Sequence, residues 1–203
     1  ATMLGRCGII KEEEANDIVK GLKGILADIE NGTLHIDMEA EDIHTFIEGE
    51  LTKRIGDNGK RLHTSRSRND QVAVDIKLYL KKEVVNVKNL VVGLIKVIAD
   101  KAEKYSETVM PGYTHLQRAQ PITFGHHLLA YGEMLLRDVS RLEDCLKRMD
   151  EMPLGSCALA GTTYPIDRTI TAKLLGFDRI TNNSLDGVSD RDYCIEFASV
   201  LSI

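Results

Sequence analysis

The sequence predicts an all-α protein in which long helices pack side by side as a bundle. Apolar residues recur at helical spacing along almost the whole chain, and only four of its 203 residues are proline. No segment shows the alternation of apolar and polar residues that marks a strand. Two apolar stripes continue for longer than a compact protein of this size is wide, so we expect a core shared with other subunits.

Two shorter helices are expected first. An apolar stripe over 18–29 indicates one helix, which the Asn31-Gly32 pair ends. A second stripe over 43–55 indicates another helix, which ends at Gly56. A polar and strongly basic loop follows it.

Two long helices form the predicted bundle. One runs from Asp70 to about Tyr105, a length of roughly 50 Å at ~1.5 Å per residue. The other is expected to start at Pro121, because proline suits the first position of a helix. Its apolar stripe continues to Met149.

The last quarter of the chain is less regular. Glycines and prolines interrupt residues 153–183, and Ser189 is expected to cap a final helix, with Asp192 three positions later. We divide the chain into residues 1–68, the remainder of a small N-terminal helical domain, and residues 69–203, the first part of a central long-helix domain. Both ends are expected to be truncated, because the chain lacks an initiator methionine and closes on apolar residues in helical rhythm.

Composition limits the partners that the protein can have. With 43% hydrophobic and 28% charged residues, the chain has the make-up of a soluble globular protein, and no apolar run is long enough to span a bilayer. A net charge of −5 argues against nucleic acid as a partner. The four cysteines lie far apart without a CxxC pair, which favours a reducing, cytoplasmic location and argues against a zinc site.

A basic stretch precedes the first long helix. Its cationic side chains are Lys60, Arg61, His63, Arg66 and Arg68. No acid interrupts them until Asp70, so they predict a compact cationic patch that suits a small anionic ligand. The exposed amides and positive dipole end of the following helix add to this attraction. The alternative is a solvated loop in which Asn69 or Asp70 only caps the helix.

A second polar segment surrounds His115, which is expected in a turn just before a helix. An imidazole changes its charge near physiological pH, so His115 is a candidate proton donor or acceptor. Thr114 and Gln117 are placed to bind a polar substrate beside it. Taken alone, a single histidine is more often structural than catalytic, and His44, on a predicted helix, has the same ordinary interpretation. These residues leave open a lyase, a metabolite-binding regulator or an oligomeric structural protein.

Five segments, in this order and separation, resemble argininosuccinate lyase, a family of the fumarase/aspartase superfamily. They are Asp42–Thr45, His63–Gln71, Gly112–Pro121, Pro153–Gly161 and Thr181–Asp186. The Thr-His-Leu-Gln run alone indicates only the superfamily. The Ser-Arg-Ser-Arg-Asn-Asp-Gln run is more specific and selects argininosuccinate lyase over fumarase, aspartase and adenylosuccinate lyase.

The resemblance implies a homotetramer around a long helical bundle, with each active site built from three subunits. It implies β-elimination of argininosuccinate to fumarate and arginine, a step of arginine biosynthesis, without a metal or an organic cofactor. Carried over position by position, His115 is the acid/base histidine, Arg68 and Asn69 hold substrate carboxylates, and His44 supports the site. The expected substrate-contacting residues are Ser67, Arg68, Asn69, Thr114, Gln117 and His44.

The chain also departs from the family pattern. The third conserved segment, a Gly-Ser-Ser loop with the serine favoured as the proton-abstracting base, would lie beyond Ile203, and the extreme N-terminal substrate-binding segment is missing. Cys157 stands where the family commonly has glycine. We therefore expect the isolated chain to be inactive. A non-catalytic, crystallin-like relative and another fumarate-releasing lyase of the superfamily are the alternatives.

Overall fold

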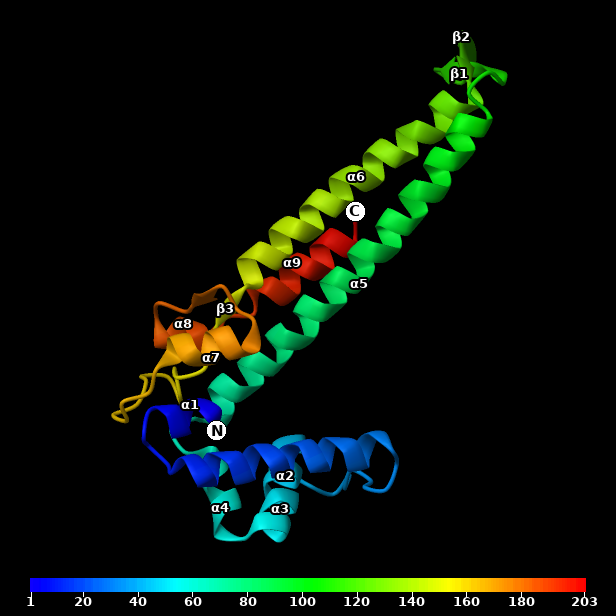
Figure 1. Ribbon diagram of the computed structural model, residues 1–203. Coiled ribbons are helices and arrows are strands. Elements are labelled where there is room, and N and C mark those ends of the chain that lie inside the picture. The colour runs from blue at the N-terminus through cyan, green and yellow to red at the C-terminus, as the bar shows by residue number, and fades with distance from the viewer. The chain divides into compact units, whose positions relative to one another are not determined.

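The computed structural model describes all 203 residues, which form two compact units (Figure 1). The first unit combines Ala1–Val74 with Glu151–Ser189, and the second combines Asp75–Asp150 with Asp190–Ile203. Both units are mostly helical, which confirms the predicted fold class. The division into domains at residue 68 stays a prediction.

Two helices of the first unit have the bounds that the sequence predicts. α2 (Glu12–Glu30) ends at Asn31, and α3 (Ile43–Ile55) ends at Gly56. Asp42 caps α3, because its carboxylate accepts a hydrogen bond from the Thr45 backbone N–H over 2.6 Å. The other elements of this unit are α1 (Thr2–Arg6), α4 (Asp57–Lys60), the 3₁₀ helix η1 (Arg61–His63), the start of α5 (Arg68–Lys104), α7 (Arg168–Leu175), α8 (Ser184–Ser189) and the parallel strands β3 (Glu151–Met152) and β4 (Arg179–Ile180).

The core of the first unit is built mainly by the first three helices. Its buried residues are Leu4, Ile10, Ala15, Ile18, Ile25, Leu51 and Leu62. Gly21 lets α2 and α3 approach closely, because a Cβ at this position would come within 2.5 Å of the Leu51 side chain. This packing anchors α3, the helix that carries His44 and Glu48.

Two long helices dominate the second unit. α5 is continuous from Arg68 to Lys104, as predicted, and is about 55 Å long at ~1.5 Å per residue. α6 (Phe124–Met149) and α9 (Asp192–Leu201) lie along it in Figure 1. Their shared core consists of Val84, Leu142, Cys145, Met149, Tyr193 and Phe197.

A β-hairpin joins α5 to α6 and corrects the sequence analysis, which found no strands. It consists of two antiparallel strands, β1 (Val109–Thr114) and β2 (Gln117–Thr123). α6 therefore starts at Phe124 and not at Pro121, because Pro121 pairs with Pro111 across the hairpin. The hydroxyl of Thr123 caps the helix by accepting a hydrogen bond from the His126 backbone N–H over 3.1 Å. The hairpin escaped prediction because most of its residues are exposed, so no apolar alternation marks its strands.

The start of the last helix also differs from the prediction. Ser189 is the final residue of α8, and α9 begins at Asp192. The turn is stabilised by Asp190, whose carboxylate accepts a hydrogen bond from the Asp192 backbone N–H over 2.8 Å. The same carboxylate pairs with the ammonium of Lys77, a buried residue of α5, at 3.4 Å.

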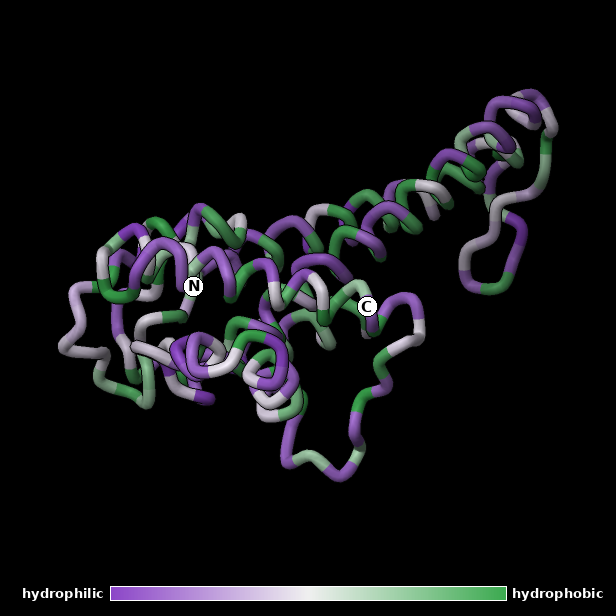
Figure 2. Tube along the Cα trace, turned by 60° about the horizontal axis from the view of Figure 1, so that its bottom comes forward, coloured by the Kyte–Doolittle hydropathy of each residue, from purple (hydrophilic) through white to green (hydrophobic).

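Apolar and hydrophilic residues are interspersed along both long helices (Figure 2). Several large apolar side chains on them are exposed: Tyr79, Val85, Leu90, Leu94 and Val97 on α5, and Leu129, Tyr131, Met134 and Leu136 on α6. No helix combines the length and the apolar content that crossing a membrane requires. The sharing of a core between subunits stays a prediction.

Candidate functional site

The N-terminus of α5 is fixed by a buried carboxylate. Asp70 is completely buried, and one of its oxygens accepts a hydrogen bond from the Ser67 backbone N–H over 3.0 Å. Its other oxygen accepts from the backbone N–H groups of Gly155 and Cys157, over 2.9 and 2.8 Å. Ser67 in turn accepts from the Asn69 backbone N–H over 3.3 Å. The capping role that the sequence allowed for Asp70 is therefore confirmed, and the same carboxylate ties the helix start to the loop that follows β3.

Cys157 has a left-handed backbone conformation, with a φ of 54°. Glycine adopts this conformation at little cost, which gives a physical reason for glycine at this position in the resembled family. The thiol of Cys157 is buried and donates to the Ser65 backbone carbonyl over 3.4 Å. Ser65 is itself left-handed, with a φ of 55°. Two strained residues thus meet where the basic segment contacts the loop after β3.

Glu48 on α3 contacts three of the basic side chains that were expected to form a cationic patch. Its carboxylate lies 2.9 Å from His63 Nδ1, 3.1 Å from an Arg66 nitrogen and 3.2 Å from an Arg68 nitrogen. Partial burial alone would raise the pKa of Glu48, but the hydrogen bonds and charges of these neighbours hold that pKa below its ordinary value. The carboxylate is therefore the common anion of this cluster.

The expected cationic patch is wrong as a description of the folded chain. Arg61 pairs with Glu14 at 3.3 Å, and Lys60 pairs with Asp57 at 2.7 Å. The remaining three basic side chains share Glu48. These acids come before the basic segment in the sequence, so a local count of charges missed them. A ligand carboxylate near this segment meets cations that already have partners.

Arg68 is the most highly connected of these cations. Its guanidinium pairs with Asp42 at 2.9 Å and donates to the Thr45 hydroxyl over 3.2 Å. It also donates to the Gln71 side-chain oxygen over 2.8 Å, and the Gln71 amide nitrogen lies 2.7 Å from His44 Nδ1. Arg68 and His44 therefore belong to one hydrogen-bonded network. Arg68 can hold a substrate carboxylate only in competition with Asp42 and Glu48.

Asn69 differs from its neighbour because it is exposed. Its side-chain amide donates to the Ala158 backbone carbonyl over 2.8 Å, which links it to the loop after β3. The structure thus brings together four of the predicted site residues, His44, Ser67, Arg68 and Asn69, all in the first unit.

His115 and Leu116 form the two-residue loop of the β1–β2 hairpin, between the paired residues Thr114 and Gln117. Their φ angles are 49° and 61°, so both central residues are left-handed, as in a type I′ turn. Each such residue other than glycine costs of order 1–3 kcal/mol. The expectation that His115 directly precedes a helix is wrong, because β2 separates it from α6. Thr114, His115 and Gln117 are brought together by the turn, but in the second unit.

Gly112 allows the hairpin to bulge. Pro111 pairs with Pro121 and Tyr113 with Arg118, so Gly112 faces two residues of the opposite strand. A Cβ on Gly112 would lie 2.9 Å from the Gln120 carbonyl oxygen. The bulge requires glycine and sets the register that places the turn at residues 115 and 116.

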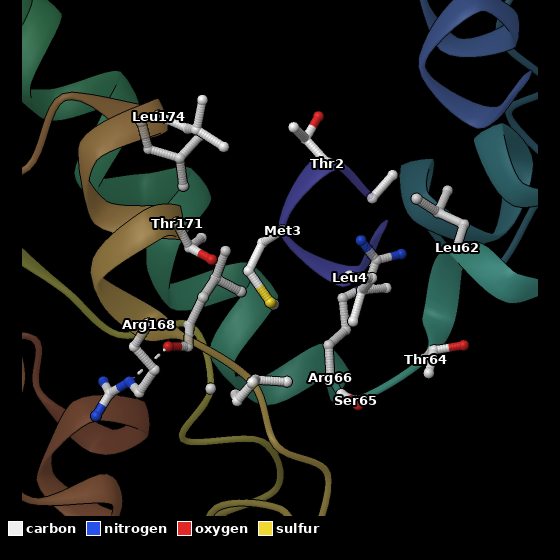
Figure 3. Close-up of a pocket in the computed structure, with 15 residues that line it drawn as sticks. Thr2, Met3, Leu4, Leu62, Thr64, Ser65, Arg66, Arg168, Thr171 and Leu174 are labelled. Atoms are coloured by element: carbon white, nitrogen blue, oxygen red, sulfur yellow. Dashed lines mark hydrogen bonds between the residues drawn. The ribbon is translucent and has the colours of Figure 1, made fainter. Parts of the chain in front are cut away.

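A cavity of about 260 Å³, which no pattern in the sequence predicts, lies in the first unit between α1, the basic segment and α7. Figure 3 shows Met3, Leu4 and Leu174 among its walls. Ser65 and Thr171 also line it, and their hydroxyls are buried without a hydrogen-bond partner. Elsewhere in the chain, no group of three or more His, Cys, Asp or Glu residues is arranged to hold a metal ion.

The chain matches a family model described as lyase over residues 2–203. Among curated proteins it is similar to the argininosuccinate lyases of Heliobacterium mobile (60% identical), Desulforamulus reducens (59%) and Acinetobacter baumannii (57%), in each case over all 203 residues. These alignments cover 44%, 44% and 43% of the three relatives. The chain therefore spans less than half the length of these relatives.

Two solved structures extend the similarity to the fold. EDDS lyase in complex with formate has a TM-score of 0.86 and 34% identity, over 98% of this chain and 39% of that protein. β-Carboxy-cis,cis-muconate cycloisomerase from Acinetobacter calcoaceticus has a TM-score of 0.75 and 22% identity, over 98% of this chain and 48% of that protein. The second similarity concerns the fold alone.

Proposed function

This chain belongs to the lyase family, and from that premise we propose that the whole protein is an argininosuccinate lyase, which splits argininosuccinate into fumarate and arginine. The observation that carries the proposal is the identity of 57–60% to argininosuccinate lyases over every residue of the chain. The substrate-contacting segments fall inside this match. The proposed step belongs to arginine biosynthesis, takes place in the cytoplasm and needs no cofactor.

The proposed substrate carries several carboxylates, and the N-terminus of α5 is suited to hold them. Asn69 is exposed there, and Ser67 and Arg68 flank it with a hydroxyl and a guanidinium. Positive charge and the helix dipole act on the same anion at this point. Because Arg68 is already paired with Asp42 and Glu48, we expect it to orient the substrate more than to neutralise it.

In the proposed reaction a base removes a proton from the carbon beside a substrate carboxylate. The C–H electron pair becomes the new double bond of fumarate, and the C–N bond breaks with its electrons on the leaving guanidine nitrogen, which then takes up a proton. Negative charge builds up on the carboxylate during the first step, and preorganised hydrogen-bond donors stabilise it. We assign a proton-transfer role to His115, with Thr114 and Gln117 as substrate contacts. Positioned proton transfer contributes about 10²- to 10⁴-fold to the rate.

We further propose that four copies assemble through the exposed apolar residues of the long helices. Leu90 is 74% exposed and Val97 54% exposed on α5, and Leu129 is 49% exposed on α6. Apolar side chains repeated along a helix pair are what a shared bundle core requires. In such an assembly the segment around residue 115 comes from a different subunit than the segments around residues 44 and 68, which lie together in one chain. His44 has a supporting role in that site.

The test is a substrate panel on the whole protein, with fumarate release followed by ultraviolet absorbance. Argininosuccinate should be cleaved, and adenylosuccinate, aspartate and malate should not. Replacement His115→Asn should lower kcat at least 100-fold while size exclusion still shows a tetramer. The matched control is His126→Asn, an exposed histidine at the start of α6, which should keep activity within about twofold of wild type. Turnover by the isolated 203-residue chain would contradict the expectation that segments outside it complete the site.

The similarity to EDDS lyase, a variant of which binds fumarate, favours one second candidate, another fumarate-releasing lyase with a different substrate. The same panel separates the two, because such an enzyme would leave argininosuccinate intact. A tetramer that binds argininosuccinate without cleaving it would point instead to a regulator or to a crystallin-like structural protein.

A further inference from the structure

The hairpin register forces a left-handed turn at His115-Leu116, but the residues of the turn are not the ones that adopt it most easily. Two-residue hairpin loops with two left-handed residues strongly prefer Asn-Gly, and here the pair is His115-Leu116. Neither side chain makes a hydrogen bond, ion pair or ring contact within the chain. Strand pairing is therefore all that opposes the cost of the two left-handed residues within the chain, and a contact from outside it would hold the turn more firmly.

Leu116 is the residue at which such a contact would act. Its side chain is 99% exposed, at the tip of the hairpin. Val109 and Tyr113 of β1 are 72% and 61% exposed, so β1 and the turn present apolar surface together. A two-stranded hairpin that buries so little is only marginally stable by itself.

We propose that Leu116 is a positioning residue for the reaction assigned to this protein: a second copy of the chain covers its side chain, and this contact holds the turn in the left-handed conformation that orients His115. This inference rests on the proposed function. A second copy is the occupant because exposed apolar residues of α5 and α6, the surface assigned to assembly, reach to within about two helical turns of the hairpin, at Val97 and Leu129.

Three variants of the whole protein separate the side chain from the backbone. Leu116→Ala keeps the energetic cost of the left-handed backbone and removes most of the side chain. Leu116→Gly removes the side chain and this cost together. Leu116→Met keeps the volume and the apolar character. If the side chain positions His115, Leu116→Ala and Leu116→Gly should both lower kcat about 10- to 100-fold, with a smaller change in KM. Leu116→Met, which keeps the apolar contact, should have a kcat within about threefold of wild type.

The control is Leu26→Ala, which removes a leucine that is 56% exposed on α2, and it should leave kcat within about twofold of wild type. Hydrogen exchange gives a second readout that does not depend on activity. The amides of the turn should be protected in the assembled wild-type protein and should exchange at least tenfold faster in Leu116→Ala.

The outcomes separate this inference from the proposed function. An active wild type with unchanged kcat and unchanged exchange in Leu116→Ala would overturn the role of Leu116 and leave the proposed function intact. A wild type that is inactive on argininosuccinate would overturn the proposed function and the positioning role together. If Leu116→Ala dissociates, activity is measured at concentrations where size exclusion shows reassembly, and full activity there would overturn the positioning role.

Discussion

Replacement Asp70→Asn tests whether one buried carboxylate ties the start of α5 to the loop after β3. The carboxylate is completely buried and accepts three backbone hydrogen bonds, from Ser67, Gly155 and Cys157. Asparagine has the same shape but only one accepting oxygen, so its NH₂ group must face at least one of these N–H donors.

The cost follows from the number of bonds lost. If the asparagine oxygen faces Gly155 and Cys157, only the Ser67 N–H loses its acceptor, at about 1–3 kcal/mol. Loss of the negative charge in the first turn of α5 adds about 0.3–1 kcal/mol. The free energy of unfolding should therefore fall by about 1.3–4 kcal/mol.

Urea unfolding of the whole protein measures the global effect, and hydrogen exchange measures the local one. The Ser67 amide, which loses its acceptor, should exchange about 8- to 700-fold faster in Asp70→Asn, which is the same free energy expressed as a ratio. Asp57→Asn is the control, because that side chain is 89% exposed and its ion pair with Lys60 lies on the surface. It should lose less than about 1 kcal/mol. A loss below 1 kcal/mol in Asp70→Asn, with unchanged exchange, would refute the reasoning.

Three further predictions concern single side chains. The pKa of Glu48 is held below its ordinary value of 4.5, so its bonds stabilise the fold above that pH and lose their effect as the pH falls through the lower, folded value; acid titration of Glu48→Gln should accordingly show a shallower loss of stability below pH 4.5 than wild type. Burial raises the pKa of Tyr193 to about 12, and its hydroxyl has no partner; Tyr193→Phe should therefore raise the free energy of unfolding by about 1 kcal/mol in urea, and a loss of stability would contradict this. Cys157→Gly removes the cost of a left-handed non-glycine residue, ~1–2 kcal/mol, but it increases the entropy of the unfolded chain and removes a buried thiol. The free energy of unfolding measured in urea should therefore stay within about 1 kcal/mol of wild type.

The helical elements could be predicted from the sequence because their signals are local. The stripe of α2 and the stop at Asn31, like the stripe of α3 and the stop at Gly56, depend on spacing within a few residues. The continuous α5 was predictable for the same reason. Prediction failed where a local signal had two interpretations. Pro121 suits the first turn of a helix. It also suits an exposed strand at a position where no backbone N–H has to donate a hydrogen bond, because proline has none.

The chemistry of the site was harder to predict, because the partners of its side chains lie far away in the sequence. Glu48 precedes Arg68 by 20 residues, and Asp70 precedes Cys157 by 87. A count of charges along the chain therefore suggested a free cationic patch where the folded chain has a paired network. The residue types of the site could be read from the sequence, but the state of each side chain depended on tertiary contacts.

The two strained segments, at Ser65 and at His115-Leu116, lie inside the two motifs that carry the family resemblance. Histidine adopts a left-handed backbone more readily than most residues, but serine and leucine do not, so propensity alone would relieve Ser65 and Leu116 with glycine. At Ser65 the backbone carbonyl accepts a hydrogen bond from the Cys157 thiol, so a contact within the chain supports the conformation. At His115-Leu116 no contact within the chain does so, and the same physical cost must be met by the assembled protein. The difference between the two segments is therefore the reason to look for the second copy at the hairpin and not at the start of α5.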